Sequence, residues 1–403
     1  MRITILTIGT HGDVLPYVAL GRGLHAKGHE VTIATLAQFS SFVTDYGLQP
    51  ASLRGAYLEA ARTPSGNPLK LIRQYQQMAR ETLDDEWRSA HNAEVFIYNP
   101  AAWGGYHIAD KLGVPAFAAF PAPLYSPTRE FPSPFFPFRS LGPFNQLSHR
   151  VFAKLGPALF QRPIKEWRRD TLGLPPARGE GMLHERPVTK LYAYSSAVVP
   201  VPADWDDSSV VTGYWFLDTP THWQPPPELV SFLERGPAPV YVGFGSMAFH
   251  DAARQTAIVL EALRLARQRA VLATGWGGLK SEDVPSSIFV LDSVPHAWLF
   301  PQVAAVVHHG GAGTTGAGLR AGKPTVICPI VGDQSFWGRR IATLGAGPQP
   351  IPLRRLTAER LAGAIRSAVN DEHIRQRAAS LGTTIRSEDG VGRALAHILG
   401  RQG

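Results

Sequence analysis

Short apolar segments alternate with segments of helical periodicity in two parts of this chain, and that alternation constrains the fold more than any other feature. Residues 3–8 and 30–35 are β-branched runs, and between them apolar residues recur with helical spacing. The same alternation restarts at residue 240 and continues through apolar runs at 303–308 and 325–328. Strands joined by helices form βαβ units, so we predict two α/β halves, each with a parallel sheet covered by helices on both faces.

A segment rich in proline and polar residues separates the two halves. It covers residues 218–239 and has the composition of an interdomain linker. We therefore predict a first domain at 1–217, the linker at 218–239, a second domain at 240–385 and a C-terminal helix at 386–403. Open parallel sheets bind ligands beyond the carboxyl ends of their strands, so the cleft between the two domains is the expected site.

Composition excludes several classes of protein. With 403 residues, of which 44% are hydrophobic and 18% charged, the chain has ample material for a packed core and is not intrinsically disordered. The single cysteine, Cys328, excludes a disulfide framework and any site with several cysteine ligands, and a reducing cytoplasm is the expected location. No apolar run reaches the ~18 residues of a membrane helix. The N-terminal apolar run is too short for a signal peptide.

The net charge of +8 indicates that a binding partner is anionic. The basic residues are scattered and form no long run, which argues against nucleic acid. An anionic small substrate or an anionic membrane surface suits the same charge. Peripheral contact with a membrane is therefore one expectation for this chain.

A glycine-rich segment at residues 306–316 carries the strongest functional signal. It follows a predicted strand and opens a predicted helix, so backbone N–H groups and the helix N-terminus can approach a phosphate closely. His309 adds a side-chain donor, and Thr314 and Thr315 add hydroxyl groups. A tight turn would need only one glycine, and the spacing fits neither a Walker loop nor a dinucleotide fingerprint. We predict a diphosphate site here.

Several motifs together resemble the signature of family 1 UDP-glycosyltransferases. They are Pro295-His296-Ala297-Trp298-Leu299-Phe300-Pro301, the glycine-rich segment with its two histidines, Gly332-Asp333-Gln334 followed by Phe336-Trp337, and Gly9-Thr10-His11-Gly12-Asp13-Val14-Leu15-Pro16. Within this family, a signature that contains two adjacent histidines and the Phe-Trp pair most resembles that of the sterol 3-beta-glucosyltransferase branch. Bacterial antibiotic glycosyltransferases share much of the same signature. The resemblance runs from residue 1 to the C-terminal helices and is weaker between about 50 and 200.

The resemblance implies a GT-B fold, in which two Rossmann-like domains with parallel sheets face each other across a cleft and the C-terminal helices pack back onto the N-terminal domain. The N-terminal domain would bind the acceptor, and the C-terminal domain the nucleotide sugar. His309 would contact the α-phosphate, and Asp333 and Gln334 would bind sugar hydroxyls. The other implied donor contacts are Ser246 near the β-phosphate, Gly311, Gly313 and Thr314 at the phosphates, and Val294, Pro295 and His296 at the pyrimidine.

Two positions depart from the plant pattern of this family. Plant enzymes stack uracil on a Trp where this chain has Ser293, and they bind the ribose with a Glu where it has Ala317. A deoxythymidine donor fits Ala317 because it lacks the 2′-hydroxyl, but the sterol branch also lacks that Glu. UDP-sugar and dTDP-sugar therefore both stay open as donor substrates, and we expect no separate cofactor.

A metal is not expected either. The helix N-terminus, backbone donors and His309 can stabilise a departing diphosphate. Asp204-Trp205-Asp206 has the spacing of a metal-binding Asp-x-Asp motif, but it lies shortly before the linker and we interpret it as a turn.

Inverting glycosyl transfer needs a base that takes the proton from the acceptor hydroxyl. The loop after the first strand offers His11 and Asp13, and the family motif aligns Asp13 with the catalytic position. A carboxylate of pKa ~3.9 is a weak base but is already ionised, whereas a histidine near ~6.5 is better matched to neutral pH. We predict Asp13 as the base and His11 as a substrate contact or second base. The alternative for Asp13 is a helix N-cap.

Aromatic side chains gather in an irregular segment of the first half. Residues 121–144 combine proline and phenylalanine at a density that no regular helix or central strand accepts. They could line an apolar acceptor site, anchor loops, or dock on a membrane. The candidates for acceptor binding are Trp103, Phe120, Tyr125, Phe131, Phe135 and Phe136.

The prediction is an inverting glycosyltransferase that moves a hexose, glucose first, from a nucleotide diphosphate sugar to a hydroxyl of a sterol-like or other polycyclic acceptor. A tailoring enzyme for a bacterial natural product or a flavonoid is the alternative. Arg supplies 32 of the 40 basic residues, which suggests a GC-rich bacterial genome and favours that alternative. A UDP-sugar epimerase and a non-catalytic relative fit less well, because the aromatic segment and the intact motifs argue against them.

Overall fold

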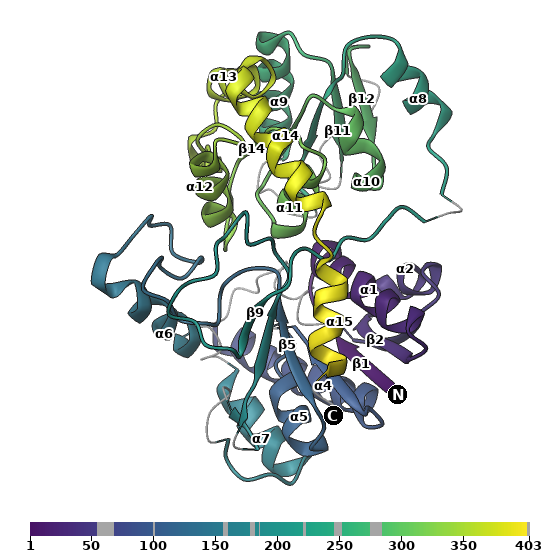
Figure 1. Ribbon diagram of the computed structural model, residues 1–403, viewed down its shortest axis with the longest axis vertical. Helices are drawn as coiled ribbons and strands as arrows, with labels where there is room; N and C mark the ends of the chain where they lie inside the picture. The colour runs from purple at the N-terminus through teal and green to yellow at the C-terminus, as the bar shows by residue number, and fades with distance from the viewer. Residues whose placement is uncertain are drawn as a thin grey trace.

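The computed structural model consists of two α/β halves, each built on its own parallel sheet (Figure 1). The N-terminal sheet lies in the lower half of the view and the C-terminal sheet in the upper half. The residues that the structure describes are 1–54, 68–99, 101–155, 160–177, 182–184, 186–220, 223–245, 252–274 and 284–400.

The N-terminal sheet has seven strands in the order β3-β2-β1-β4-β5-β8-β9, and every pairing is parallel. The strands are β1 (Arg2–Leu6), β2 (Glu30–Leu36), β3 (Gln49–Leu53), β4 (Val95–Tyr98), β5 (Ala116–Phe120), β8 (Thr189–Tyr192) and β9 (Ser209–Val211). β1 is inside the sheet, between β2 and β4. Its Ile3, Ile5 and Leu6 are buried, because helices cover both faces of the sheet.

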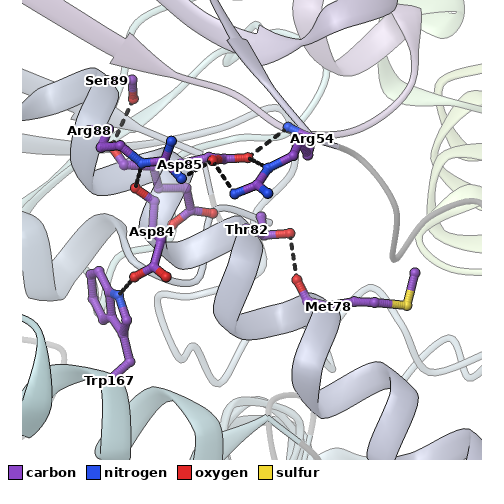
Figure 2. Close-up of polar contacts among 9 residues, drawn as sticks. Arg54, Met78, Thr82, Asp84, Asp85, Arg88, Ser89 and Trp167 are labelled. Atoms are coloured by element: carbon purple, nitrogen blue, oxygen red, sulfur yellow. Dashed lines mark hydrogen bonds and ion pairs between the residues drawn. The ribbon is translucent and has the colours of Figure 1, made fainter.

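The helices of this half are α1 (His11–Ala26), α2 (Ser40–Asp45), α4 (Pro68–Ala90), α5 (Gly105–Leu112), α6 (Asn145–Leu155) and α7 (Gln161–Asp170). Figure 2 shows how α4 is tied to its neighbours. The carboxylate of Asp85 accepts a hydrogen bond from Arg54 Nε at 2.8 Å, just after β3. Asp84 accepts one from Trp167 Nε1 of α7, also at 2.8 Å. These contacts fix the outer layer of the first sheet.

The C-terminal sheet has five parallel strands in the order β12-β11-β10-β13-β14. Its strands are β10 (Val240–Gly243), β11 (Ala270–Ala273), β12 (Ile288–Leu291), β13 (Ala305–His308) and β14 (Thr325–Ile327). Its helices are α8 (Pro227–Glu234), α9 (Ala252–Ala266), α10 (His296–Leu299), α11 (Ala312–Arg320), α12 (Gln334–Leu344), α13 (Ala358–Asn370) and α14 (Glu372–Arg386). Alternate residues of β10 enter two separate apolar clusters, Val240 and Val242 on one face and Tyr241 on the other.

The last helix, α15 (Gly390–Gly400), returns to the N-terminal half and packs on α1 (Figure 1). The approach is close, because a Cβ on Gly23 of α1 would lie 2.5 Å from Val391 Cγ1. Just before α15, Glu388 accepts a hydrogen bond from Ser195 Oγ at 2.6 Å. The return of the chain makes the GT-B arrangement, in which the C-terminal segment clamps the two halves together.

Most predicted elements are present within two to four residues of their expected bounds, and residues 121–144 are irregular except for a short 3-10 helix at Gly142–Phe144. The predictions missed β3, β8 and β9 and the helices α2 and α4. β3 includes Pro50, which is tolerated because β3 is an edge strand. The segment at 218–239 is also more regular than a linker, since α8 buries Leu229 and Phe232 against the second sheet.

Candidate active site

The glycine-rich segment forms the turn between β13 and α11. His308, at the end of β13, is fully buried, and its Nδ1 accepts a hydrogen bond from the backbone N–H of Gly310 at 3.0 Å. Gly310 has φ +98, and a Cβ there would lie 2.6 Å from Ile327 Cγ2. Helix α11 begins just after Gly311, so its first N–H groups have no intrahelical acceptor and can bind an anion.

His309 lies beside this helix start. A Cβ on Gly311 would be only 2.7 Å from His309 Nε2, and one on Gly245, after β10, would be 3.1 Å from its Cε1. Burial lowers the pKa of His309 to about 4, so the ring is neutral at pH 7. Its Nδ1 is buried and has no partner among the described residues. A neutral imidazole with uncommitted hydrogen-bonding capacity is therefore held at the candidate phosphate-binding turn.

Asp333 and Gln334 stand at the start of α12. The Nε1 of the buried Trp337 donates to Asp333 Oδ2 at 2.8 Å. Burial raises the pKa of Asp333 to about 6, the hydrogen bond from Trp337 lowers it, and the charge of Asp13 raises it. Gln334 Oε1 accepts hydrogen bonds from the N–H groups of Ile330 and Val331 at 2.7 and 3.1 Å. The groups left for a sugar are one oxygen of Asp333 and the amide nitrogen of Gln334.

The segment predicted at the pyrimidine leads into α10. Pro295 is the N-cap of this short helix, and Val294 and His296 are half-buried. The ring of His296 stacks on Phe300 at 4.2 Å, and its Nε2 lies 3.4 Å from the hydroxyl of Tyr241. Burial lowers the pKa of His296 to about 4. These contacts fix the backbone at 294–296.

The first turn of α1 holds the candidate base. Asp13 Oδ2 accepts hydrogen bonds from Thr10 N at 2.7 Å and Thr10 Oγ1 at 2.9 Å. Gly9, with φ +150, leaves room for the carboxylate, because a Cβ there would lie 2.4 Å from Asp13 Oδ2. Burial raises the pKa of Asp13, and the two bonds from Thr10 lower it. Thr10 is the N-cap and Asp13 the third residue of the helix, so the N-cap alternative for Asp13 is wrong in position.

His11 lies in the same turn but packs toward α2. Its ring centroid is 4.7 Å from that of Phe42 and 6.3 Å from that of Phe39. Burial lowers the pKa of His11, so its ring is neutral at pH 7. The two candidate bases are thus adjacent in sequence but differ in surroundings, one hydrogen-bonded and the other packed on aromatic rings.

The starts of α1 and α11 meet where the two halves join. The carbonyl oxygen of Gly12 lies 3.7 Å from the position that a Cβ on Gly313 would take. The negative charge of Asp13 also raises the pKa of Asp333 on α12. The candidate base, the candidate phosphate-binding turn and the candidate sugar-binding carboxyl are therefore gathered in one region, although they are up to 320 residues apart in sequence.

The aromatic candidates fall into separate groups. Phe120, at the end of β5, stacks on Tyr125 at 4.8 Å between ring centroids, whereas Phe131 contacts Phe336 of α12 at 5.6 Å. The exposed Phe135 stacks on Phe152 of α6 at 4.3 Å, and that ring also contacts Tyr125 at 6.1 Å. The remaining two are half-buried Phe136, whose carbonyl accepts from Arg339, and Trp103, which stacks on Phe160 at 3.7 Å.

Ser246 lies outside the described residues. Within the described part of the chain there is no cluster of three or more His, Cys, Asp or Glu side chains that could hold a metal. The carboxylate of Asp204 accepts from Thr128 Oγ1 and Arg129 N, and that of Asp206 accepts from Ser208. Asp206 is therefore bonded within its own turn, whereas Asp204 is bonded to a segment about 75 residues earlier in the chain.

The sequence reasoning missed the residues that position the site. Thr10, three residues before Asp13, completes a capping box and could have been found from the Thr-x-x-Asp spacing. Trp337 lies one helical turn after Asp333, a spacing that permits contact but does not indicate a hydrogen bond. Phe152, Phe160 and Tyr241 gave no signal, because an aromatic residue in a predicted helix or strand is indistinguishable from core.

Comparison with known proteins identifies the family. Residues 3–129 match the glycosyltransferase family 28 N-terminal domain, and residues 271–390 match the erythromycin biosynthesis protein CIII-like C-terminal domain. A sterol 3-beta-glucosyltransferase of Arabidopsis thaliana is 38% identical over 418 residues, which cover 98% of this chain and 67% of the relative. This chain belongs to the sterol 3-beta-glucosyltransferase family. The one from Aspergillus terreus is also 38% identical, over 99% of this chain.

The chain spans only part of the length of the relatives it matches. The chain spans about 30% of the length of the fungal relatives, including the one from Aspergillus terreus. Solved structures with the same fold include the glycosyltransferase of kitacinnamycin, with a TM-score of 0.73 and 21% identity over 100% of this chain and 98% of that one. The calicheamicin glycosyltransferase has a TM-score of 0.70 and 17% identity over 100% and 99%. No helix in the described ranges is long and apolar enough to cross a membrane.

Proposed function

We propose that this chain is an inverting glycosyltransferase that moves glucose from a nucleotide diphosphate sugar to a hydroxyl of a sterol or sterol-like polycyclic alcohol. The observation that carries the proposal is the meeting of the first turns of α1 and α11, with Asp13 close enough to Asp333 for its charge to raise the pKa of that group. A base beside a sugar-binding carboxyl and a diphosphate-binding turn is the constellation that glycosyl transfer needs.

The reaction follows from the positions of these groups. Asp13 takes the proton from the acceptor hydroxyl while the hydroxyl oxygen forms a bond to the anomeric carbon. On the opposite side, the bond between that carbon and the β-phosphate oxygen breaks, and the diphosphate leaves with the electron pair. Burial raises the pKa of Asp13, which makes it a stronger base than an exposed carboxylate. Thr10 holds the carboxylate by two hydrogen bonds and so fixes its direction.

The C-terminal half stabilises the departing diphosphate. The unpaired N–H groups at the start of α11 face the negative charge, and neutral His309 donates a hydrogen bond from its ring. Thr314, on the first turn of α11, adds a hydroxyl donor. We include in the proposal that no metal and no further cofactor take part, because these donors are sufficient to bind the charge.

The donor and acceptor are proposed from the family. Its named relatives are sterol 3-beta-glucosyltransferases, which supports glucose as the sugar and a sterol as the acceptor. We propose UDP-glucose as the donor from the resemblance of the donor-site motifs to those of UDP-glycosyltransferases. We place the enzyme in the cytoplasm, in peripheral contact with a membrane that holds such an acceptor. The alternative is a bacterial tailoring enzyme that glycosylates a natural product or flavonoid with a UDP- or dTDP-sugar, which the high content of arginine favours.

The test is the Asp13→Asn variant, which keeps the shape of the side chain and removes its basicity. We expect the rate of transfer to fall by about a hundredfold or more, with the dissociation constant for UDP, measured calorimetrically, unchanged. Asp45→Asn is the matched control, because Asp45 is an exposed carboxylate of the same half. Retention of most of the rate by Asp13→Asn would refute the assignment of the base.

Substrate identity needs a separate experiment. Purified protein is incubated with UDP-glucose or dTDP-glucose and with sterols, flavonoids or macrolide aglycones, and products are detected by mass spectrometry. A glucosylated sterol formed from UDP-glucose supports the proposal, and a product formed only from dTDP-glucose or only on a macrolide supports the alternative. Donor incubated alone checks for epimerisation, which would overturn both.

A further inference from the structure

We propose that the outward side of α6 is a docking face for an anionic lipid membrane. This face, called the α6 face below, consists of Phe144 and the side chains that follow it at helical spacing, Leu147, Val151 and Leu155. Their exposed fractions are 63%, 50%, 36% and 65%. Residues four apart lie on one side of a helix, so the last three form one apolar stripe. Figure 1 shows α6 at the outer side of the N-terminal half, away from α1 and α15.

The polarity of α6 is inverted relative to a helix that faces water. Its buried residues are polar, namely Asn145, Ser148 and His149, and each is held by named partners. Ser148 Oγ accepts from Ser133 N at 2.8 Å, and Asn145 Nδ2 donates to the carbonyl of Arg129 at 2.8 Å. The ring nitrogens of His149 lie 3.3 and 3.1 Å from the carbonyl oxygens of Leu124 and Phe131.

These bonds fix the rotation of the helix, so the apolar stripe cannot turn inward without breaking a buried polar network. A surface helix in water has the opposite arrangement, with its apolar side on the core. A contiguous apolar patch on the surface of a protein marks a site of interaction with an apolar partner. The arrangement of α6 therefore requires a covering surface.

The charged residues around the α6 face indicate which kind of surface covers it. Residues 131–165 include no aspartate or glutamate and carry Arg139, Arg150, Lys154, Arg162 and Lys165. Arg162 pairs with Glu166 at 2.9 Å, whereas Arg139, Arg150 and Lys154 are exposed and make no ion pair within the described residues. Apolar side chains flanked by basic ones fit an interface of hydrocarbon and anionic headgroups. If two copies of this chain associated through their α6 faces, the positive charges of the two copies would lie close together and repel each other.

The face is continuous with the aromatic groups that lead toward the active site. Phe135, 45% exposed, stacks on Phe152 of α6, which contacts Tyr125, which in turn stacks on Phe120 at the end of β5. A chain of rings therefore joins the α6 face to the carboxyl end of the first sheet. This part of the inference rests on the proposed function, because an apolar acceptor that leaves a membrane at α6 would meet these rings first.

The experiment measures co-flotation of the full-length chain with vesicles, without donor or acceptor. One set of vesicles is pure phosphatidylcholine, and in the other about a third of the lipid is phosphatidylglycerol, which supplies the negative surface charge. We expect binding to the anionic vesicles and weak binding to the neutral ones. In the Leu147→Glu/Leu155→Glu variant the partition coefficient should fall by about tenfold for each leucine removed. Arg150→Gln/Lys154→Gln should lose about fivefold per charge, on anionic vesicles only.

Matched controls separate docking from general effects. Met182→Glu introduces a charge at an exposed apolar residue of the same half but outside the α6 face, and Arg354→Gln/Arg355→Gln removes two exposed arginines from the C-terminal half. Both should bind vesicles like the unmodified chain. Circular dichroism checks that each variant is folded, and glucosylation of a water-soluble acceptor checks that the active site is unaffected.

Two outcomes overturn the inference. The first is vesicle binding by Leu147→Glu/Leu155→Glu that equals that of Met182→Glu. The second is a dimer in sedimentation that the same substitutions convert to a monomer, because the α6 face would then cover a second copy of the chain. Vesicle binding is measured without substrates, so its failure is distinguishable from failure of the proposed reaction.

Discussion

The hydrogen bond between Trp337 and Asp333 allows a test of how the fold sets the charge of the donor site. Trp337→Phe keeps most of the buried ring and removes the indole N–H that donates to Asp333 Oδ2 at 2.8 Å. Asp333 is predicted to accept a hydrogen bond from a sugar hydroxyl, and an ionised carboxylate is the stronger acceptor. The substitution should therefore impair the donor site at pH values where the unmodified chain still works.

The size of the effect follows from the bond that is lost. A hydrogen bond to a charged group contributes about 1.5–3 kcal/mol, and one pH unit of pKa corresponds to about 1.4 kcal/mol. Burial raises the pKa of Asp333 to about 6 despite the bond from Trp337. Its loss should raise that pKa further, by about one to two pH units. At pH 7 the ionised fraction would then fall by about two- to tenfold, and near pH 9 it would recover.

The assay is the pH dependence of kcat/KM for the nucleotide sugar. We expect the acidic limb of the profile to move upward by about one to two pH units in Trp337→Phe. Trp167→Phe is the matched control, because Trp167 is also buried and its indole also donates to a carboxylate at 2.8 Å, that of Asp84 (Figure 2). Both variants should lose about 1–3 kcal/mol of stability. If both lower activity equally, with the profile unmoved, Trp337 acts only through packing and the reasoning is refuted.

Two further predictions concern a buried acid and a glycine. Burial raises the pKa of Glu86 to about 8, well above its unfolded value of 4.5, so the folded chain holds a proton that the unfolded chain releases, and stability should fall as pH rises from about 4.5 to 8. In Glu86→Gln the amide oxygen can still accept the hydrogen bond from Gly104 N, but the side chain no longer titrates, so this dependence of stability on pH should disappear. Thermal unfolding at pH 6 and pH 9 measures the dependence. If it is unchanged in the variant, other groups cause it. Gly311→Ala places a Cβ 2.7 Å from His309 Nε2 and should weaken UDP binding by about tenfold. Calorimetry measures the affinity for UDP. The control is Gly363→Ala, because a Cβ on Gly363 of α13 would meet no other atom within 4 Å. Equal affinities of the two variants for UDP would contradict the effect of the close contact at Gly311.

The motifs predicted the fold well, and they supplied the candidate site residues, because both depend on local sequence. Short apolar strands before helices indicate parallel sheets, and residues 9–16 and 306–316 stand where strands end and helices begin. Predictions were weakest between about 50 and 200. β8 lies in that range and β9 follows shortly after it. They have only four and three residues, and their pairing with β5 and with each other is decided by tertiary packing.

The orientation of side chains was beyond the sequence. Nothing in the sequence pattern indicates that α6 buries Asn145, Ser148 and His149 and exposes its leucines. That choice depends on hydrogen bonds to residues of the irregular segment before it, which no periodicity encodes. The same holds for His11, whose packing on Phe42 comes from a separate helix.

The sequence by itself determined two α/β halves, and it supplied a candidate diphosphate-binding turn and a candidate base, since each is a property of residues adjacent in the chain. Only the tertiary structure decided which of these groups meet. The return of α15 to α1, with the hydrogen bond between Glu388 and Ser195, holds the halves so that the starts of α1 and α11 touch. Burial raises the pKa values of both Asp13 and Asp333, and the negative charge of Asp13 raises that of Asp333 further.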